Sequence, residues 1–150
     1  AKSLFKEWID PIKEIIKNTL EADLGNFTLK DLDSQTLFRE KEFLFSKDGY
    51  LKGVIDLVFM HQGKVYLVDW KSNWLGPTGA HYTKKAMEAS MEAHSYTLQA
   101  HIYAKAIDKY LKIFSKSALV FGGVYYIYLR GVSPETGIYY MHPDEVLHGG

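Results

Sequence analysis

The sequence predicts an α/β fold with a mixed central sheet flanked by helices. Three observations carry this prediction. The chain has 150 residues, which is enough for a single domain with its own hydrophobic core. Its apolar residues switch along the chain between helical spacing and the alternation that is typical of strands. The segments follow one another in the order helix, three strands, helices, strand, which is typical of an α/β domain.

The N-terminal half is predicted to contain one helix and three strands. Helical spacing of apolar residues predicts a helix over 4–22, in which Pro11 indicates a kink or a later start with Asp10 as the N-cap. A loop over 25–35 follows. The three strands are expected over residues 36–45, 51–60 and 65–71, with a turn signal, SKDG, between the first and the second.

The C-terminal half is predicted to be helical first and then extended. Residues 83–113 have a helical pattern, with a break expected near His94 and Ser95. The aromatic and β-branched segment over 118–131 predicts a long strand. A short strand is expected at 138–141 within a tail of loop.

Composition and charge restrict the class of protein without defining it. The hydrophobic content is 47% and the formal net charge is zero, so the chain as a whole neither indicates nor excludes binding of nucleic acid. The lack of cysteine excludes disulfides and thiolate metal sites. Together with the absence of a signal peptide, the lack of cysteine leads us to expect a cytoplasmic protein. No apolar run approaches the roughly 20 residues of a membrane span, so we expect no membrane partner. The chain begins in a helical pattern without a start methionine, so we expect a single domain, residues 1–150, from a longer protein.

Two aspartates and a lysine interrupt the apolar residues of the stretch GVIDLVFMHQGKVYLVDWKSN. The segment HQGK predicts a hairpin turn, because Gly63 provides permissive backbone dihedrals. A loop of two residues and a loop of four give the same register, and in that register Asp56 lies directly opposite Asp69. Lys71 is two residues beyond Asp69 and therefore points to the same face. A loop of three residues would instead turn one aspartate to the other face.

The predicted arrangement of these charges indicates a metal site. Like charges directly opposite one another destabilise a sheet, and unpaired carboxylates beside an apolar core take up a proton or cost several kcal/mol. Mg²⁺ removes this conflict, since it binds one or two carboxylates together with water and substrate phosphate. Lys71 is then expected near the bound water or a phosphate oxygen. The alternative is a plain salt bridge between Lys71 and one aspartate on a solvated sheet face.

Several segments of the chain resemble a known family of nucleases. The order Asp…(Asp/Glu)-x-Lys in VID and VDWK resembles the PD-(D/E)XK nuclease superfamily. The segments LKGVIDLVF, YLVDWKSNWLG, YTLQAHIYAKAI and FGGVYYIYLRGV together resemble the C-terminal nuclease domain of RecB, the beta subunit of exodeoxyribonuclease V. The resemblance covers about residues 38–132 in family order, and it implies a restriction-endonuclease-like fold.

The resemblance implies metal-dependent hydrolysis of DNA phosphodiester bonds in double-strand-break repair and recombination. Mg²⁺ is the implied cofactor, with Mn²⁺ as a substitute. Asp56 and Asp69 match the metal-binding aspartates of the family, and Lys71 matches its catalytic lysine. The main-chain carbonyl of Trp70 matches a further metal ligand.

Three more residues receive roles from the resemblance. Glu42 matches the acidic residue of the strand before the hairpin, which acts at or near the metal site. Glu40 is its rival, and spacing cannot choose between the two. Gln99 and Tyr103 match the QxxxY motif, which is linked to holding DNA near the site, and as residues i and i+4 of a helix they share one face.

Two departures from the family limit what this chain is expected to do alone. The family has a metal-binding histidine on an upstream helix, and the first predicted helix here contains none, so we expect weak activity or none. The chain has no Gly-rich loop ending in Gly-Lys-Ser/Thr, so we expect a helicase domain and RecC- and RecD-like subunits to supply single-stranded DNA ends. The main alternative is a nuclease-like module that binds DNA or protein without cutting, and a purely structural domain is a third interpretation.

Overall fold

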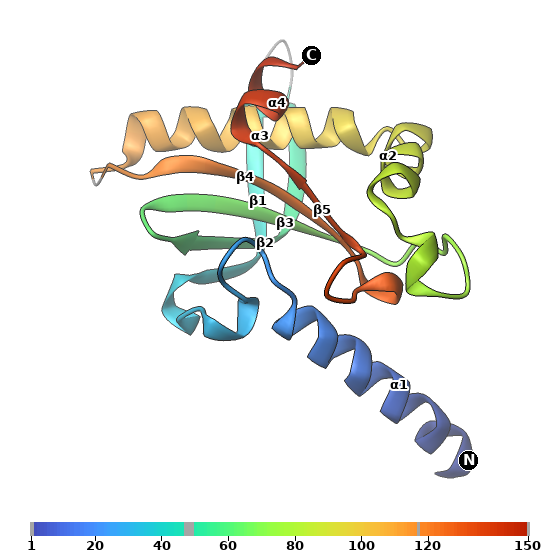
Figure 1. The fold of residues 1–150 in the computed structure, drawn as a ribbon. Coiled ribbons are helices and arrows are strands. Elements are labelled where there is room, and N and C mark those ends of the chain that lie inside the picture. Colours follow the sequence, from blue (N-terminus) through green and yellow to red (C-terminus); the bar gives the residue numbers. More distant parts are fainter. Residues whose placement is uncertain (1, 47–49, 117, 150) are drawn as a thin grey trace.

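A five-stranded sheet forms the centre of the molecule in the computed structural model, which describes residues 2–46, 50–116 and 118–149 (Figure 1). The strands lie across the sheet in chain order, and they are β1 (Leu37–Ser46), β2 (Tyr50–His61), β3 (Lys64–Lys71), β4 (Val120–Tyr128) and β5 (Ile138–Met141). β3 and β4 are parallel, and every other neighbouring pair is antiparallel. The prediction of an α/β fold with a mixed sheet is therefore confirmed.

Helices cover one face of this sheet. They are α2 (Lys84–Ala93), α3 (Tyr96–Phe114) and α4 (Pro143–His148), and both α3 and α4 pack on β4. The first helix, α1 (Lys2–Glu21), extends away from the other side of the molecule and contacts it through its C-terminal end (Figure 1). Short 3₁₀ turns at Leu29–Asp31 and Ser34–Thr36 connect α1 to β1.

Alternation along the strands produces two hydrophobic layers. The layer under α2 and α3 includes Leu67 and Tyr126, whereas the next residue of each strand, Val68 and Ile127, belongs to the layer on the opposite face. Val68 and Ile127 are fully buried, and a buried side chain of this size contributes roughly 1.5–3 kcal/mol to stability. β3 and β4 are thus packed against hydrophobic layers on both of their faces.

The helices confirm one expectation and correct two. The predicted break before α3 is present, because Ser95 has the left-handed φ of 57°. The expected later start of the first helix is wrong: α1 begins at Lys2 and contains Pro11. Proline removes one main-chain hydrogen bond from a helix, and here the flanking turns keep their helical form. The helix α4 was not predicted, and it begins with Pro143 in its first turn after the N-cap His142.

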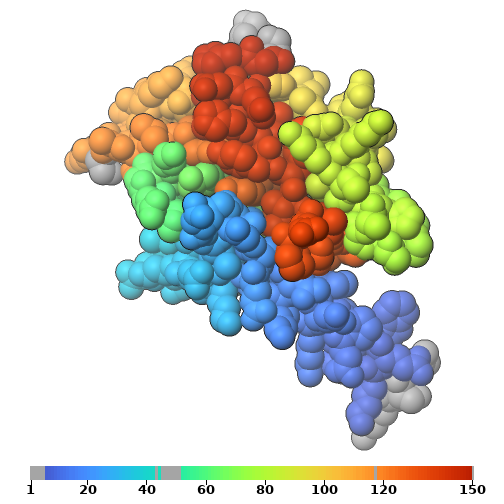
Figure 2. Space-filling model, in the orientation of Figure 1, coloured from blue at the N-terminus to red at the C-terminus, as the bar shows by residue number. Residues whose placement is uncertain are grey.

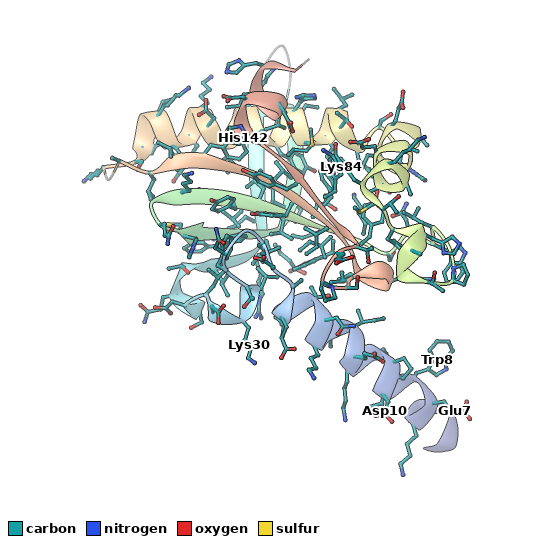
Figure 3. The ribbon with its side chains drawn as sticks, in the orientation of Figure 1. Glu7, Trp8, Asp10, Lys30, Lys84 and His142 are labelled. Atoms are coloured by element: carbon teal, nitrogen blue, oxygen red, sulfur yellow. The ribbon has the colours of Figure 1, made fainter. Side chains whose placement is uncertain are left out.

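The predicted apolar face of α1 forms, but it is exposed. Trp8 is 66% exposed, and Ile12 and Ile16 are about half exposed. Figure 2 shows α1 extending beyond the body of the molecule, and Figure 3 shows Trp8 at a distance from the sheet. No helix within residues 2–46, 50–116 and 118–149 is long and apolar enough to cross a membrane.

Candidate active site

The turn between β2 and β3 sets the geometry of the site. Gln62 and Gly63 form a two-residue loop with φ values of 49° and 73°, both in the left-handed region, as in the type I′ turn that suits the twist of a hairpin. His61 accordingly pairs with Lys64, and the ladder continues to Leu57 and Val68. The predicted register of the hairpin is confirmed.

Asp56 of β2 and Asp69 of β3 occupy the position just beyond Leu57 and Val68, the last pair of the ladder. The ladder between the strands ends one residue earlier, and Asp56 Oδ2 instead accepts a hydrogen bond from the main-chain N–H of Trp70 at 2.9 Å. The alternation of faces on β2 also breaks at this point, since Ile55 and Leu57 belong to different hydrophobic layers. The side chain of Asp56 therefore turns toward the main chain of β3 where β2 and β3 separate.

Asp69 forms an ion pair with Lys71, and both groups are largely shielded from solvent. Lys71 Nζ lies 2.8 Å from Asp69 Oδ1, and the two side chains are 10% and 18% exposed respectively. Burial raises the pKa of Asp69, the hydrogen bond and charge of Lys71 oppose this shift, and the charge of Asp56 adds to it. The salt bridge of the alternative interpretation is thus present, but in a partly buried site that also contains a second carboxylate.

Two tyrosines surround the ammonium group of Lys71. Its Nζ lies 3.5 Å from the centroid of the Tyr96 ring and 5.3 Å from that of the Tyr126 ring. Burial, followed by the charge of Asp69, raises the pKa of Tyr126, so this hydroxyl stays neutral. Sequence reasoning missed both tyrosines. One available signal was that Tyr96, Gln99 and Tyr103 recur at helical spacing and so share a face of α3.

The structure separates the two candidate glutamates of β1. Glu42 is exposed and forms an ion pair with Lys52, with 3.3 Å between the charged atoms. Glu40 lines a cleft of about 440 Å³ together with Asp56 and Trp70. The register of β1 and β2 also places Glu40 opposite Asp56, where Glu40 interrupts the ladder with a φ of 49°. Of the two glutamates, Glu40 therefore shares a cleft with Asp56, and the role predicted for Glu42 stays a prediction.

Gln99 and Tyr103 contact each other on α3. Gln99 Nε2 donates a hydrogen bond to the Tyr103 hydroxyl at 3.0 Å. Gln99 Oε1 is buried, and no hydrogen-bond partner for it occurs in the described part of the chain. Tyr103 lies close enough to Tyr126 to contribute to the raised pKa of that residue. The QxxxY pair is thus near the residues that surround Lys71, and its contact with DNA stays a prediction.

The acidic groups present fit a partial site for Mg²⁺. In the part of the chain that the structure describes, no three His, Cys, Asp or Glu side chains gather as a metal-binding group. Asp56 and Asp69 are two neighbouring carboxylates whose mutual repulsion helps to raise the pKa of Asp69. Mg²⁺ commonly binds one or two carboxylates and fills its remaining positions with water and substrate phosphate, so this donor set suits it.

Comparisons with known proteins identify similar sequences. No protein-family model matches the chain. The chain is 48% identical over 105 residues to the RecBCD enzyme subunit RecB of Escherichia coli K12 and 39% identical over 151 residues to that of Haemophilus influenzae Rd. It is 36% identical over 135 residues to the same subunit of Buchnera aphidicola subsp. Schizaphis graminum. The matches with the subunits of E. coli, H. influenzae and B. aphidicola include 66%, 92% and 88% of this chain, respectively. In the same order, the chain spans only 9%, 12% and 12% of the length of these relatives.

Proposed function

Since this chain is a RecB-like domain, we propose that it is a metal-dependent nuclease that hydrolyses phosphodiester bonds of DNA. The observation that carries the proposal is the confirmed register of the β2–β3 hairpin. It brings Asp56 and Asp69 to adjacent positions, with the ammonium of Lys71 2.8 Å from Asp69. Two carboxylates can hold a divalent cation, and an ammonium beside them can stabilise negative charge on a phosphate.

Each of these side chains has a distinct task in the proposed reaction. Asp56 and Asp69 would hold Mg²⁺, for which Mn²⁺ would substitute. The bound ion lowers the pKa of a water molecule and neutralises charge on the phosphate. Lys71 orients the attacking water or stabilises negative charge on the scissile phosphate. Because Lys71 is only 10% exposed on its side chain, water screens this charge less than it would on an open surface.

The hydrogen bond from Trp70 to Asp56 supports the proposed role of the Trp70 carbonyl. The N–H and C=O groups of one strand residue point to the same edge of the strand. Since the N–H of Trp70 points to Asp56, its C=O points to that edge as well. We therefore propose the carbonyl as a further metal ligand, with Gln99 and Tyr103 holding DNA nearby.

The setting of this activity is part of the proposal. The relatives are named as subunits of the RecBCD enzyme, and they are much longer than this chain. We propose that the chain works in such an assembly in the cytoplasm, where a helicase domain and RecC- and RecD-like subunits deliver single-stranded DNA ends. Its task there would be DNA cleavage during double-strand-break repair and recombination.

A nuclease-like module that binds DNA or protein without cutting is the second candidate. It is favoured by the small donor set, since the described residues bring together two carboxylates and not a group of three metal-binding side chains. A site with so few ligands binds a cation weakly, and the domain could then hold DNA without activating water.

Cleavage of a labelled single-stranded oligonucleotide separates the two candidates. We expect weak cleavage in Mg²⁺ or Mn²⁺, and a loss of at least about 100-fold from that rate in Asp69→Asn. The matched control is Asp108→Asn, which removes a carboxylate from the ion pair with Lys112 on α3 and should cleave normally. DNA retention without cleavage in every variant would support the binding module, and cleavage that survives Asp69→Asn would contradict the nuclease site proposed here.

A further inference from the structure

We propose that Tyr96 is a positioning residue for Lys71, which its aromatic ring fixes beside the carboxylates. This inference rests on the proposed nuclease function for its catalytic consequence, and on geometry for the contact itself. A ring face attracts an ammonium group electrostatically, most strongly where water is excluded. Lys71 Nζ is 3.5 Å from the Tyr96 ring centroid, and the lysine side chain is 10% exposed.

Contacts on both sides hold Tyr96 in place. The Tyr126 hydroxyl donates a hydrogen bond of 2.9 Å to the main-chain carbonyl of Tyr96. The rings of these two residues are stacked, with an interplanar angle of 14°. At the other end, the Tyr96 hydroxyl lies 3.3 Å from the amide nitrogen of Asn73, which follows Lys71 by two residues. Tyr96 thus connects the first turn of α3 to β4 and to the segment that leaves β3.

The Tyr96 ring attracts the Lys71 ammonium without using its N–H donors, whereas the ion pair with Asp69 uses one of them. A carboxylate holds an ammonium group through an N–H donor and a full negative charge, and Asp69 is also a proposed ligand of the cation. If Asp69 held a cation, Lys71 would lose much of that attraction. The Tyr96 ring attracts the ammonium without an oxygen acceptor, so the N–H donors remain available for a water molecule or a phosphate oxygen. Lys71 would therefore keep its position in an occupied site.

Replacement of Tyr96 tests the catalytic consequence. Tyr96→Phe keeps the ring, and we expect its kcat to stay within about twofold of the wild type. Tyr96→Leu removes the ring, and we expect kcat to fall about tenfold while the KM for DNA changes little, since Lys71 acts on the reacting atoms. The control is Tyr110→Leu on the exposed surface of α3, which should match the wild type. An unchanged kcat in Tyr96→Leu would overturn the proposal.

A graded series of fluorinated rings keeps the proposal testable if Tyr96→Leu does not fold. Phenylalanines with one, two and three fluorine atoms at position 96 keep the shape of the ring and progressively weaken its negative face. We expect the logarithm of kcat to fall stepwise along this series. A flat series would show that the ring acts by packing alone, and would overturn the proposal.

Nuclear magnetic resonance of the protein without metal or DNA tests the contact independently of cleavage. The ε-methylene protons of Lys71 should resonate upfield in the wild type and in Tyr96→Phe, because the adjacent Nζ lies 3.5 Å from the ring centroid. The upfield shift should shrink markedly in Tyr96→Leu, which leaves only the more distant ring of Tyr126. Ordinary shifts in the wild type would overturn the proposal. If no variant cleaves DNA but the upfield shift is present, the proposed function fails and the positioning of Lys71 by Tyr96 stands.

Discussion

Asp56 accepts a hydrogen bond from the main-chain N–H of Trp70, the residue that follows Asp69, with 2.9 Å between the donor and acceptor atoms. One carboxylate therefore satisfies a main-chain donor of β3 and also stands next to the second acid of the site. The charge of Asp56 helps to raise the pKa of Asp69. The structural contribution of Asp56 and its contribution to cation binding can be separated by substitution.

Asp56→Asn and Asp56→Ala should have different effects on stability without divalent cations. Asparagine keeps an oxygen acceptor for the N–H of Trp70 and removes the repulsion with Asp69, so the free energy of unfolding should change little. Alanine leaves that N–H without its acceptor, which costs about 1–3 kcal/mol. Urea unfolding measures both values, with Asp108→Asn as the control. Equal destabilisation by asparagine and alanine would contradict this account of the hydrogen bond.

The raised pKa of Asp69 predicts how stability depends on pH. The folded state binds a proton at Asp69 more tightly than the unfolded chain, whose carboxyl titrates near 3.8. Folding therefore disfavours the charged form of Asp69. This loss of stability is absent well below pH 3.8, where Asp69 is protonated in both states, and complete above the raised pKa of the folded state. The free energy of unfolding of the wild type minus that of Asp69→Asn should fall as pH rises through this window. A difference that rises with pH would show that Lys71 outweighs burial.

Glu40→Gln and Glu42→Gln form a matched pair of substitutions on one strand. Glu40 lines the same cleft as Asp56, whereas Glu42 pairs with Lys52 in solvent. We expect Glu40→Gln to reduce cleavage at least about tenfold, because removal of one electrostatic contributor in an active site commonly has an effect of this size or larger. Glu42→Gln should stay close to the wild type. The opposite order would assign the acidic role to Glu42, as the sequence resemblance suggested.

The hairpin and its charges could be predicted from the sequence because their determinants are local. The turn residues Gln62 and Gly63 set the register, and the register sets which side chains are neighbours. The break before α3 was likewise visible near Ser95, and the order of the elements was sufficient for the mixed sheet. Each of these features depends on residues that are close in the chain or on the period of the apolar pattern.

The features that were missed are a contact between distant segments and two local departures from the usual rules. The contact of Lys71 with Tyr96 joins the end of β3 to the start of α3, and no local pattern encodes it. The left-handed φ of Glu40 breaks the regular strand that would make Glu40 and Glu42 equivalent. Pro11 remains inside α1, and the helix continues on both sides of it, although the local rule places proline at a helix start.

The turn offers a prediction about stability that does not involve the charged residues. Gln62 has a φ of 49°, and type I′ turns prefer Asn-Gly, because asparagine tolerates the left-handed region better than glutamine does. We expect Gln62→Asn to raise the free energy of unfolding by several tenths of a kcal/mol without altering the register. Gly63→Ala, at a φ of 73°, should lower it by about 1 kcal/mol. Thermal unfolding of both variants, with unchanged hairpin amide shifts, is the measurement; a loss of stability in Gln62→Asn would contradict the assigned turn.

Selective broadening of amide resonances by Mn²⁺ tests the central claim, that Asp56 and Asp69 share a divalent cation, most directly. This measurement detects weak binding, so the small donor set is no obstacle. In the wild type, we expect resonances of Asp56 and of Asp69 to Lys71 to broaden first as Mn²⁺ is added. Asp69→Asn should abolish this effect, and Asp108→Asn should leave it intact. Broadening that begins elsewhere, or that persists at these residues in Asp69→Asn, would contradict the account.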